Sequence, residues 1–425
     1  MVVETKLFGF VMLALLMALV VSFLTSPLVK NFAYKVGAID VPKDARRMHK
    51  TPTPRLGGLA IFLGFMISVI LFVPIRGDRE MQSILMGAVI IVVLGVVDDI
   101  MALPAMLKFV VQLAAALIPA LNGVVVEAVS NPNIFSNNPY WVLDWLSVPV
   151  TVLWIVAVTN SVNLIDGLDG LANGVSTISA TTVLVIALIA SEAQVALVMA
   201  ALVGACVGFM PYNQNPAKMF MGDTGSTFLG FILATMSIQG LFKFYAVISF
   251  VVPFLILGLP IFDTAFAFTR RIAHGQSPMH ADRSHIHHRL IDMGLNQKQA
   301  VATLYVISAI LGLSAVVLTT GGEGKALILF AALCIVAVVA AKVVFPKEIT
   351  EELQEGFEQM LDHTHKKGGE EKDGYDPCDE RFRHPAGGHQ DVSPGEGACL
   401  PGGDREPLLC HRPAPSDAGQ RPGGF

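Results

Sequence analysis

The sequence predicts an all-α, polytopic integral membrane protein with about eleven transmembrane helices. Of its 425 residues, 53% are hydrophobic and only 15% are charged, whereas soluble proteins carry about 25% charged residues. The apolar residues occur in blocks of roughly 17–25, the length that an α-helix needs to cross a bilayer. They do not alternate with polar residues as they would in the strands of an outer-membrane barrel. An ordinary soluble protein is therefore excluded.

Residues 1–345 form the expected membrane domain, in which each apolar block predicts one helix. The blocks lie at residues 7–29, 56–75, 81–97, 106–121, 147–162, 170–190, 194–211, 225–242, 247–268, 299–319 and 325–345. The first block lies near the N-terminus, but it is long and lacks a small-residue cleavage site. These two features favour a retained helix over a signal peptide.

Residues 346–425 have a different composition, dominated by proline, glycine, histidine and charged residues. Such a segment cannot bury an apolar core, so we expect a cytoplasmic tail that is mostly disordered. From about Gly374 onward, an appended low-complexity segment and an out-of-frame translation are both open. The acidic excess behind the net charge of −5 falls in this tail, and nothing in the chain supports nucleic-acid binding. The five cysteines form neither a disulfide framework nor a metal-binding spacing.

Lysine and arginine are concentrated in alternate loops, which sets the expected orientation. The loops at residues 30–55 and 269–298 are rich in both, whereas the loop at 122–146 contains neither. Short loops that carry positive charge stay in the cytoplasm. We therefore expect the N-terminus outside, the C-terminus inside and the basic loops on the cytoplasmic side.

Two adjacent carboxylates, Asp98 and Asp99, follow the third apolar block, and Lys108 lies at the start of the next one. Side chains of consecutive helical residues diverge by about 100°. One carboxylate can therefore act as a base or a metal-linked group while the other orients it. Lys108 is well placed to bind a phosphate. The alternative for the pair is a solvated helix end without a chemical role.

The fifth block leads into NSVNLIDGLDGLANG, which carries Asn163, Asp166 and Asp169 at three-residue spacing. This spacing places their side chains on one helical face or around a glycine-interrupted turn. Carboxylate and carbonyl oxygens are the ligands that Mg²⁺ prefers. A calcium-binding loop is disfavoured, because the closing glutamate of its pattern is missing.

Asp223 lies in MGDTGST, just before the eighth block. The glycines there allow backbone amides near a helix N-terminus to face an anion, while the carboxylate can hold a cation. A simple capping aspartate is the alternative. Far earlier in the chain, the two prolines and paired glycines of TPTPRLGG predict a fixed turn into a helix that can approach a neighbour closely.

A histidine cluster, HADRSHIHHRL, occupies the last inner loop. A zinc site is one interpretation, but no cysteine accompanies the histidines, and Arg283 and Arg289 would repel a cation. Anion binding fits better, for example to the diphosphate of a nucleotide sugar, and a solvated loop without a ligand is the remaining alternative. The candidate residues are Arg283, His285, His287 and His288.

All of these polar segments fall on the cytoplasmic side of the expected topology. A membrane enzyme with its site at the inner face is therefore favoured. The rival class is a secondary transporter, whose ionisable groups would lie near the bilayer midplane on broken helices and often in paired halves. The acids here lie at helix ends, and the sequence shows no halved symmetry.

The ordered set TPRLGG, DDIMALPAMLKF, NLIDGLDGLANG, MGDTGS and HIHH resembles the polyprenyl-phosphate N-acetylhexosamine-1-phosphate transferase superfamily. The resemblance covers residues 1–345. It implies Mg²⁺, with Mn²⁺ as an alternative ion. By this resemblance the metal contacts are Asn163 and Asp223. On the side of the lipid phosphate, the paired aspartates are Asp98 and Asp99, and the phosphate-binding lysine is Lys108. On the nucleotide side, the carboxylates of the loop are Asp166 and Asp169, and the histidine motif is His285, His287 and His288.

TPRLGG and HIHH resemble the GlcNAc branch more than the muramoyl-pentapeptide branch, which tends to carry three consecutive histidines. The resemblance implies transfer of N-acetylglucosamine 1-phosphate, or a related N-acetylhexosamine 1-phosphate, from a UDP-sugar to undecaprenyl phosphate with release of UMP. The implied partners are undecaprenyl phosphate, a UDP-N-acetylhexosamine and membrane lipid, and a homodimer is left open. The implied location is the bacterial cytoplasmic membrane, with the active site on its cytoplasmic face.

Overall fold

The computed structural model describes residues 2–41, 52–130, 140–242, 251–273 and 285–321, together with a few isolated positions between 324 and 334. All of them belong to one unit, Met1–Asp362. Three predictions lie outside the described residues: the role of Arg283, most of the eleventh apolar block and the tail at 346–425.

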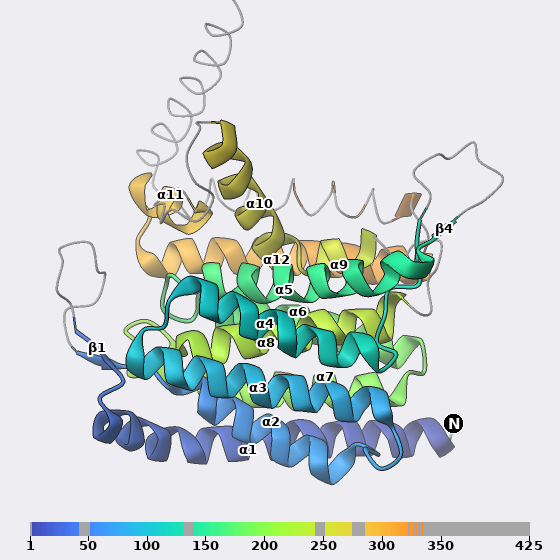
Figure 1. The fold of residues 1–425 in the computed structure, drawn as a ribbon, viewed down its shortest axis with the longest axis horizontal. Helices are drawn as coiled ribbons and strands as arrows, with labels where there is room; N and C mark the ends of the chain where they lie inside the picture. The colour runs from blue at the N-terminus through green and yellow to red at the C-terminus, as the bar shows by residue number, and fades with distance from the viewer. Residues whose placement is uncertain are drawn as a thin grey trace, which may run out of the picture. The chain divides into compact units, whose positions relative to one another are not determined.

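The described part of the chain is almost entirely helical (Figure 1). Its α-helices are α1 (Val2–Val36), α2 (Gly57–Phe72), α3 (Arg79–Met101), α4 (Ala105–Leu121), α5 (Ser147–Leu164), α6 (Leu171–Ile189), α7 (Ala193–Asn213), α8 (Gly222–Ser237), α9 (Val251–Ile256), α10 (Gly258–Ala273), α11 (Ile286–Asp292) and α12 (Gln297–Gly321). A π-helical turn, η2 (Ile238–Phe242), continues α8, and a 3₁₀ turn, η1 (Asp144–Leu146), leads into α5. Two short antiparallel hairpins pair β1 (Ile39–Asp40) with β2 (Thr53–Pro54), and β3 (Ala128–Ser130) with β4 (Tyr140–Val142).

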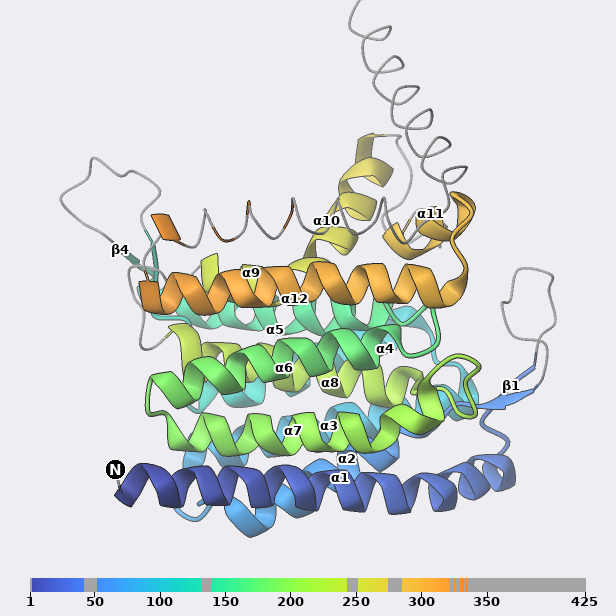
Figure 2. The ribbon, with the colours of Figure 1, turned by 180° about the vertical axis from the view of Figure 1, so that it is seen from behind.

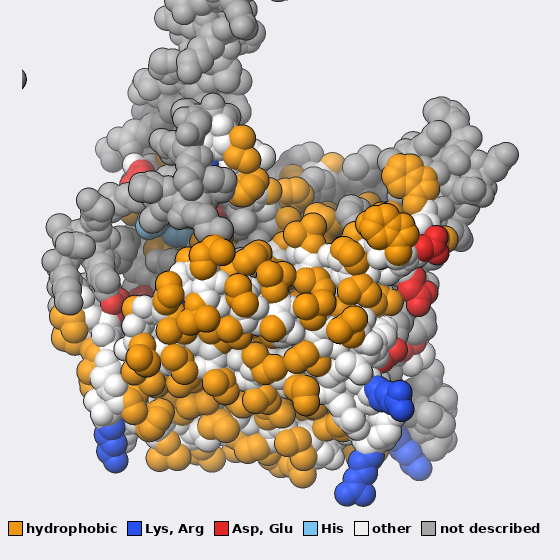
Figure 3. All heavy atoms as spheres, in the orientation of Figure 1, with side chains coloured by type: hydrophobic (Ala, Val, Ile, Leu, Met, Phe, Trp, Pro, Cys, Tyr) orange, Lys and Arg blue, Asp and Glu red, His pale blue; other side chains and the backbone are white. Residues whose placement is uncertain are grey.

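Six of the described helices are long and apolar enough to cross a membrane. They are Lys6–Val36, Arg79–Met101, Asp144–Leu164, Leu171–Ile189, Ala193–Asn213 and Gln297–Thr320, and α2 and α4 are shorter apolar helices. Large apolar side chains are exposed along α3 and α4, including Met86, Val93, Met106 and Val110. Figure 3 shows this apolar face, with the charged side chains at its margins. Such a surface fits contact with lipid, and the count of eleven spans stays a prediction.

The ninth predicted block is divided between two helices, α9 and α10, with a turn at Leu257. The two views of the ribbon show α10 leaving α9 at a steep angle (Figures 1 and 2). Pro260 explains the break, because its ring clashes with the carbonyl four residues earlier in a continuous helix. That carbonyl, of Ile256, accepts a hydrogen bond from Ser179 Oγ at 2.8 Å instead.

Glycines allow two pairs of helices, α1 with α7 and α2 with α8, to approach closely. Helix α7 packs between α1 and α6 (Figure 2). A Cβ atom added at Gly204 of α7 would lie only 2.1 Å from the Leu15 carbonyl oxygen of α1. Likewise, a Cβ at Gly58 of α2 would lie 2.0 Å from the backbone nitrogen of Gly225 in α8. Small residues at such contacts are typical of membrane helix pairs.

The α1–α7 contact predicts different outcomes for two alanine substitutions. Gly204→Ala should destabilise the protein by about 1–3 kcal/mol, because the added methyl meets backbone that cannot move aside cheaply. Gly9→Ala on α1 is the matched control, since a Cβ there meets nothing within 4 Å. Thermal unfolding in detergent would compare them, and equal midpoints for the two variants would contradict this packing.

Candidate functional site

The polar motifs meet at one end of the helices. Helices α3, α5 and α7 run toward this end, and α4, α6 and α8 start from it. Asp98 and Asp99 occupy the last turn of α3, while Lys108 and Asp223 lie in the first turns of α4 and α8. Asn163 lies at the end of α5. The clustering expected from the sequence is therefore present in space.

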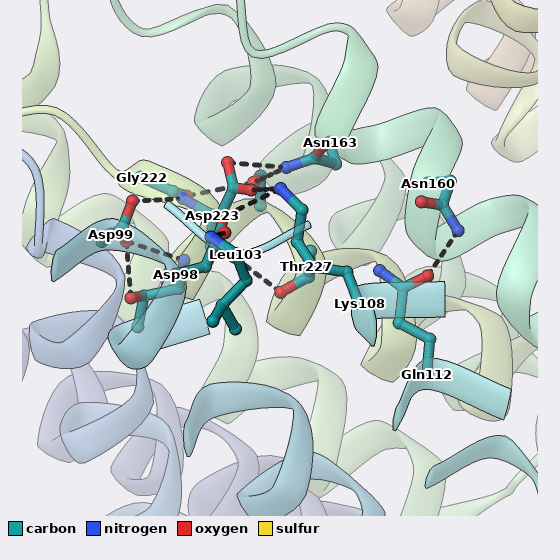
Figure 4. Close-up of polar contacts among 12 residues, drawn as sticks. Asp98, Asp99, Leu103, Lys108, Gln112, Asn160, Asn163, Gly222, Asp223 and Thr227 are labelled. Carbon is teal, nitrogen blue, oxygen red and sulfur yellow. Dashed lines mark hydrogen bonds and ion pairs between the residues drawn. The ribbon is translucent and has the colours of Figure 1, made fainter. Parts of the chain in front are cut away.

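Lys108 joins two carboxylates from different helices (Figure 4). Its Nζ lies 2.9 Å from Asp98 Oδ2 and 3.1 Å from Asp223 Oδ2. The other oxygen of Asp98 accepts a hydrogen bond from the Leu103 backbone N–H at 2.8 Å. Ala102 makes this turn with a left-handed backbone, φ 52°. The turn after α3 therefore fixes the carboxylate that holds the lysine.

Asp99 makes a different set of contacts, all directed at the start of α8. Its Oδ1 accepts the Asp223 N–H at 3.1 Å, and its Oδ2 accepts the N–H and hydroxyl of Thr224 at 3.0 and 2.7 Å. A carboxylate at a helix N-terminus is stabilised by unpaired amides and the helix dipole. Arg55 also approaches Asp99 Oδ1 at 3.5 Å. Asp99 therefore caps the start of α8.

The start of α8 leaves no room for a side chain at Gly222. Its φ is +73°, and a Cβ there would lie 2.0 Å from the Arg55 carbonyl oxygen and 2.4 Å from Asp99 Oδ2. Only glycine combines this backbone conformation with such close neighbours. The glycine before Asp223 therefore allows α3, α8 and the Arg55 segment to converge.

Two layers of amide side chains join α5 to its neighbours. Asn163 Nδ2 donates to Asp223 Oδ1 at 3.2 Å and to Ser226 Oγ at 2.8 Å. One turn deeper, Asn160 Nδ2 donates to Gln112 Oε1 at 2.7 Å (Figure 4). Gln112 is buried and was not predicted from the sequence. Its signal is the spacing of four residues from Lys108, which places both on one face of α4.

A cavity of about 340 Å³ opens beside this cluster. Its lining includes Arg55, Asn163, Asp166, Asp169, Asp223 and His288. Burial, followed by the charges of Asp223, Asp99 and Asp169, raises the pKa of Asp166 to about 8. Burial, the larger cause, and the neighbouring carboxylates thus both disfavour the charged form of Asp166.

Asp169 supports the neighbouring loop as well as lining the cavity. Its Oδ2 accepts hydrogen bonds from Asn215 Nδ2 at 2.9 Å and from the Ala217 N–H at 3.0 Å. Asn215 also donates to Gln297 Oε1 of α12 at 2.6 Å. The carboxylate therefore connects the α5–α6 loop to the α7–α8 loop and, through Asn215, to α12.

The three predicted histidines occupy different surroundings. His285 Nδ1 lies 3.0 Å from Asp263 Oδ2 of α10, and Asp263 Oδ1 accepts the Ile286 N–H at 2.7 Å. His287 is buried, and a Cβ at Gly167 would lie 2.2 Å from its Nε2. Only His288 of the three lines the cavity. The sequence did not identify Asp263 as the anchor of this motif.

Arg55 is the other residue that the sequence interpretation left without a chemical role. The sequence places it in the basic loop at 30–55 and in the turn of TPRLGG, yet its guanidinium reaches the cavity wall beside Asp99. The sequence feature that could have indicated a role for Arg55 is its place in a constrained turn, directly after Pro54 and shortly before two glycines. Among the described residues, no group of three or more His, Cys, Asp or Glu side chains is placed to hold a metal ion by itself.

His287 predicts a specific dependence of stability on pH. Burial, with smaller effects from neighbouring histidines, lowers its pKa to about 4 from the ordinary 6.5. The unfolded chain therefore takes up this proton first as the pH falls. The stability that depends on neutral His287 is complete above pH 6.5 and is lost progressively toward pH 4.

Replacing this side chain by one that does not titrate should remove that component. Between pH 7 and pH 4, the free energy of unfolding of wild type should fall by up to about 3 kcal/mol more than that of His287→Gln. Unfolding free energies of both proteins across this range would measure the difference, from which other titrating groups cancel. Parallel pH curves would refute the buried neutral histidine.

Comparison with known proteins identifies the family. Residues 81–241 match the family model described as glycosyl transferase family 4. A probable undecaprenyl-phosphate N-acetylglucosaminyl 1-phosphate transferase of Bacillus subtilis is 40% identical, over 72% of this chain and 86% of that protein. A decaprenyl-phosphate N-acetylglucosaminephosphotransferase of Mycobacterium tuberculosis is 32% identical, over 68% and 77%.

A phospho-N-acetylmuramoyl-pentapeptide-transferase of Staphylococcus aureus is 31% identical, over 70% of this chain and 96% of that protein. The GlcNAc-type protein of Bacillus subtilis thus shares more identical residues with the chain than this muramoyl-type protein does. These matches confirm the resemblance drawn from the sequence motifs. The chain belongs to glycosyl transferase family 4.

Proposed function

We propose that the protein transfers N-acetylglucosamine 1-phosphate from UDP-GlcNAc to undecaprenyl phosphate and releases UMP. The observation that carries this proposal is the Lys108 bridge between Asp98 and Asp223 beside an acidic cavity. It provides a cation for a phosphate next to carboxylates that can share a metal ion with a diphosphate. The Bacillus subtilis relative carries the name of this activity.

The surroundings of Lys108 support a lipid phosphate as acceptor. Leu107 and Phe109 flank the lysine on α4, and both are exposed, as is Met106 before them. An isoprenoid chain can therefore lie along this apolar face while its phosphate reaches the ammonium group. The cavity behind Lys108 is polar and accepts a water-soluble nucleotide. We place this end of the helices at the cytoplasmic face, because the basic loops adjoin it in the sequence.

The proposed reaction is a single exchange of phosphorus–oxygen bonds. A phosphate oxygen of undecaprenyl phosphate forms a bond to the β-phosphorus of UDP-GlcNAc, and the bond from that phosphorus to UMP breaks. A phosphate monoester has its second pKa near 6, so its dianion is available at neutral pH without a strong base. Asp98 then acts by holding Lys108 toward the acceptor, and Asp99 acts by fixing the start of α8.

The residues around Asp223 fit a magnesium ion. Mg²⁺ is usually held by one or two carboxylates together with substrate phosphates and water. Asp223 and Asn163 would hold it, and its charge would stabilise the transferred phosphoryl group and the leaving UMP. To contact the ion through Oδ1, the Asn163 amide would turn over, because in this structure its Nδ2 faces Asp223 Oδ1 and the Ser226 hydroxyl donates to the Gly222 carbonyl. After burial, the charges of Asp223, Asp99 and Asp169 also raise the pKa of Asp166, and a divalent cation beside them would offset this repulsion.

A panel of nucleotide sugars tests the reaction and its sugar specificity. Purified protein with undecaprenyl phosphate and Mg²⁺ should convert UDP-GlcNAc to a lipid-extractable product and UMP. The muramoyl-pentapeptide nucleotide is the second candidate, because a Staphylococcus aureus relative is named for it. Turnover of that nucleotide and not of UDP-GlcNAc would replace the proposed donor. No UMP release from any UDP-sugar would refute the transferase assignment.

Asp223→Asn should leave a folded protein with transfer reduced by about 10²–10³ or more. The substitution keeps the size of the side chain but removes the charge that Mg²⁺ and Lys108 need. A raised Mg²⁺ requirement should accompany any remaining activity. Asp144→Asn is the matched control, since Asp144 is exposed at the other end of the α5 region. Near-normal turnover by Asp223→Asn at unchanged Mg²⁺ dependence would remove Asp223 from the site.

A further inference from the structure

The backbone around Arg55 is held on two sides. Its N–H donates to the Ala38 carbonyl at 3.0 Å, next to the β1–β2 hairpin. The residues beside it pair with the segment before α8: the Phe220 N–H donates to the Pro54 carbonyl at 2.8 Å, and the Gly57 N–H donates to the Phe220 carbonyl at 2.9 Å. The segment that carries Arg55 is therefore a rigid part of the cavity wall.

The Arg55 guanidinium has binding capacity beyond its one described ion pair. Its contact with Asp99 Oδ1 is long, at 3.5 Å, and both oxygens of that carboxylate already accept bonds from the start of α8. A guanidinium carries five N–H donors in a planar fork. The Arg55 side chain is 35% exposed on the cavity side, so donors remain for a ligand.

The charges of the cavity indicate what that ligand is. Asp40, Asp166, Asp169 and Asp223 contribute carboxylates to its lining, and among the described lining residues Arg55 is the sole arginine or lysine. Arg55 can bind an anionic group of a ligand, whereas the lining aspartates would repel any other anionic group. The cavity therefore favours a ligand whose negative charge is confined to the part that contacts Arg55. A diphosphate next to a neutral sugar and a neutral base has this distribution.

We propose that Arg55 binds the diphosphate of the nucleotide sugar, an inference that rests on the proposed transferase function. Arginine suits this role, because its fork forms two parallel hydrogen bonds to phosphate oxygens. Asp99 is then a positioning residue that aims the guanidinium while it fixes α8. Arg55 and Lys108 thereby divide the two substrates: the cavity wall holds the donor diphosphate, and α4 holds the acceptor phosphate.

Binding measurements on three variants test this assignment without requiring turnover. Affinities for UDP and for uridine would be measured in detergent at fixed Mg²⁺ for wild type, Arg55→Gln, Arg55→Lys and Arg79→Gln. Arg55→Gln should weaken UDP binding about 10- to 100-fold, the usual effect of charge-assisted hydrogen bonds, while uridine binding stays unchanged. Arg55→Lys should show a smaller loss, since it keeps the charge without the fork. Arg79→Gln, at the opposite end of α3, should match wild type.

Steady-state kinetics distinguish the donor from the acceptor phosphate. Arg55→Lys should raise KM for UDP-GlcNAc and leave KM for undecaprenyl phosphate unchanged. A rise for the lipid alone would overturn the assignment, as would equal losses of UDP and uridine affinity, because these indicate a structural role. If wild type and Arg55→Gln bound UDP equally well, the role assigned to Arg55 would be wrong, and the proposed transferase function would be unaffected. If wild type failed to bind UDP, the proposed function would fail with it.

Discussion

The carboxylate of Asp99 at the N-terminus of α8 is the interaction on which the site depends. It accepts the N–H groups of Asp223 and Thr224, and it does so with its side chain fully buried. Gly95 allows this approach, because a Cβ there would lie 2.4 Å from Thr224 Cα. Without this cap, two backbone donors would lose their partner among apolar helices, which is costly. Because the cap holds the Asp223 N–H, it also fixes the backbone from which the Asp223 side chain projects.

Two cations lie on either side of this cap and compensate the carboxylates around it. Lys108 compensates Asp98 and Asp223 on the α4 side, and Arg55 lies beside Asp99 on the cavity side. Each cation is partly exposed, whereas Asp98 and Asp99 are buried. At this cap the two carboxylates of α3 are buried, and the two cations keep exposed surface on which an anionic group can be bound.

The sequence predicted which polar residues gather at one end of the helices, but not the contacts that each of them makes. Block lengths and motif order located the helices and brought Asp98, Lys108, Asn163 and Asp223 to one end. Periodicity could not separate the roles of Asp98 and Asp99, because the difference lies in contacts with α4 and α8. Nor could it show that Asp263 anchors His285, since these residues meet only through the break that Pro260 places between α9 and α10. Such long-range contacts have no local signal.

The distribution of polar groups with depth also bears on the rival transporter class. A cation pathway needs ionisable side chains in the membrane interior, where they are expensive and therefore kept for function. Farther along the helices from Lys108, the described side-chain contacts that join α4, α5 and α8 are between neutral groups. Gln112 contacts Asn160, and Trp154 contacts Ser237 Oγ at 3.1 Å. Neutral amides and hydroxyls join helices but carry no exchangeable charge. The ionisable cluster around Lys108 thus belongs to one end of the described helices.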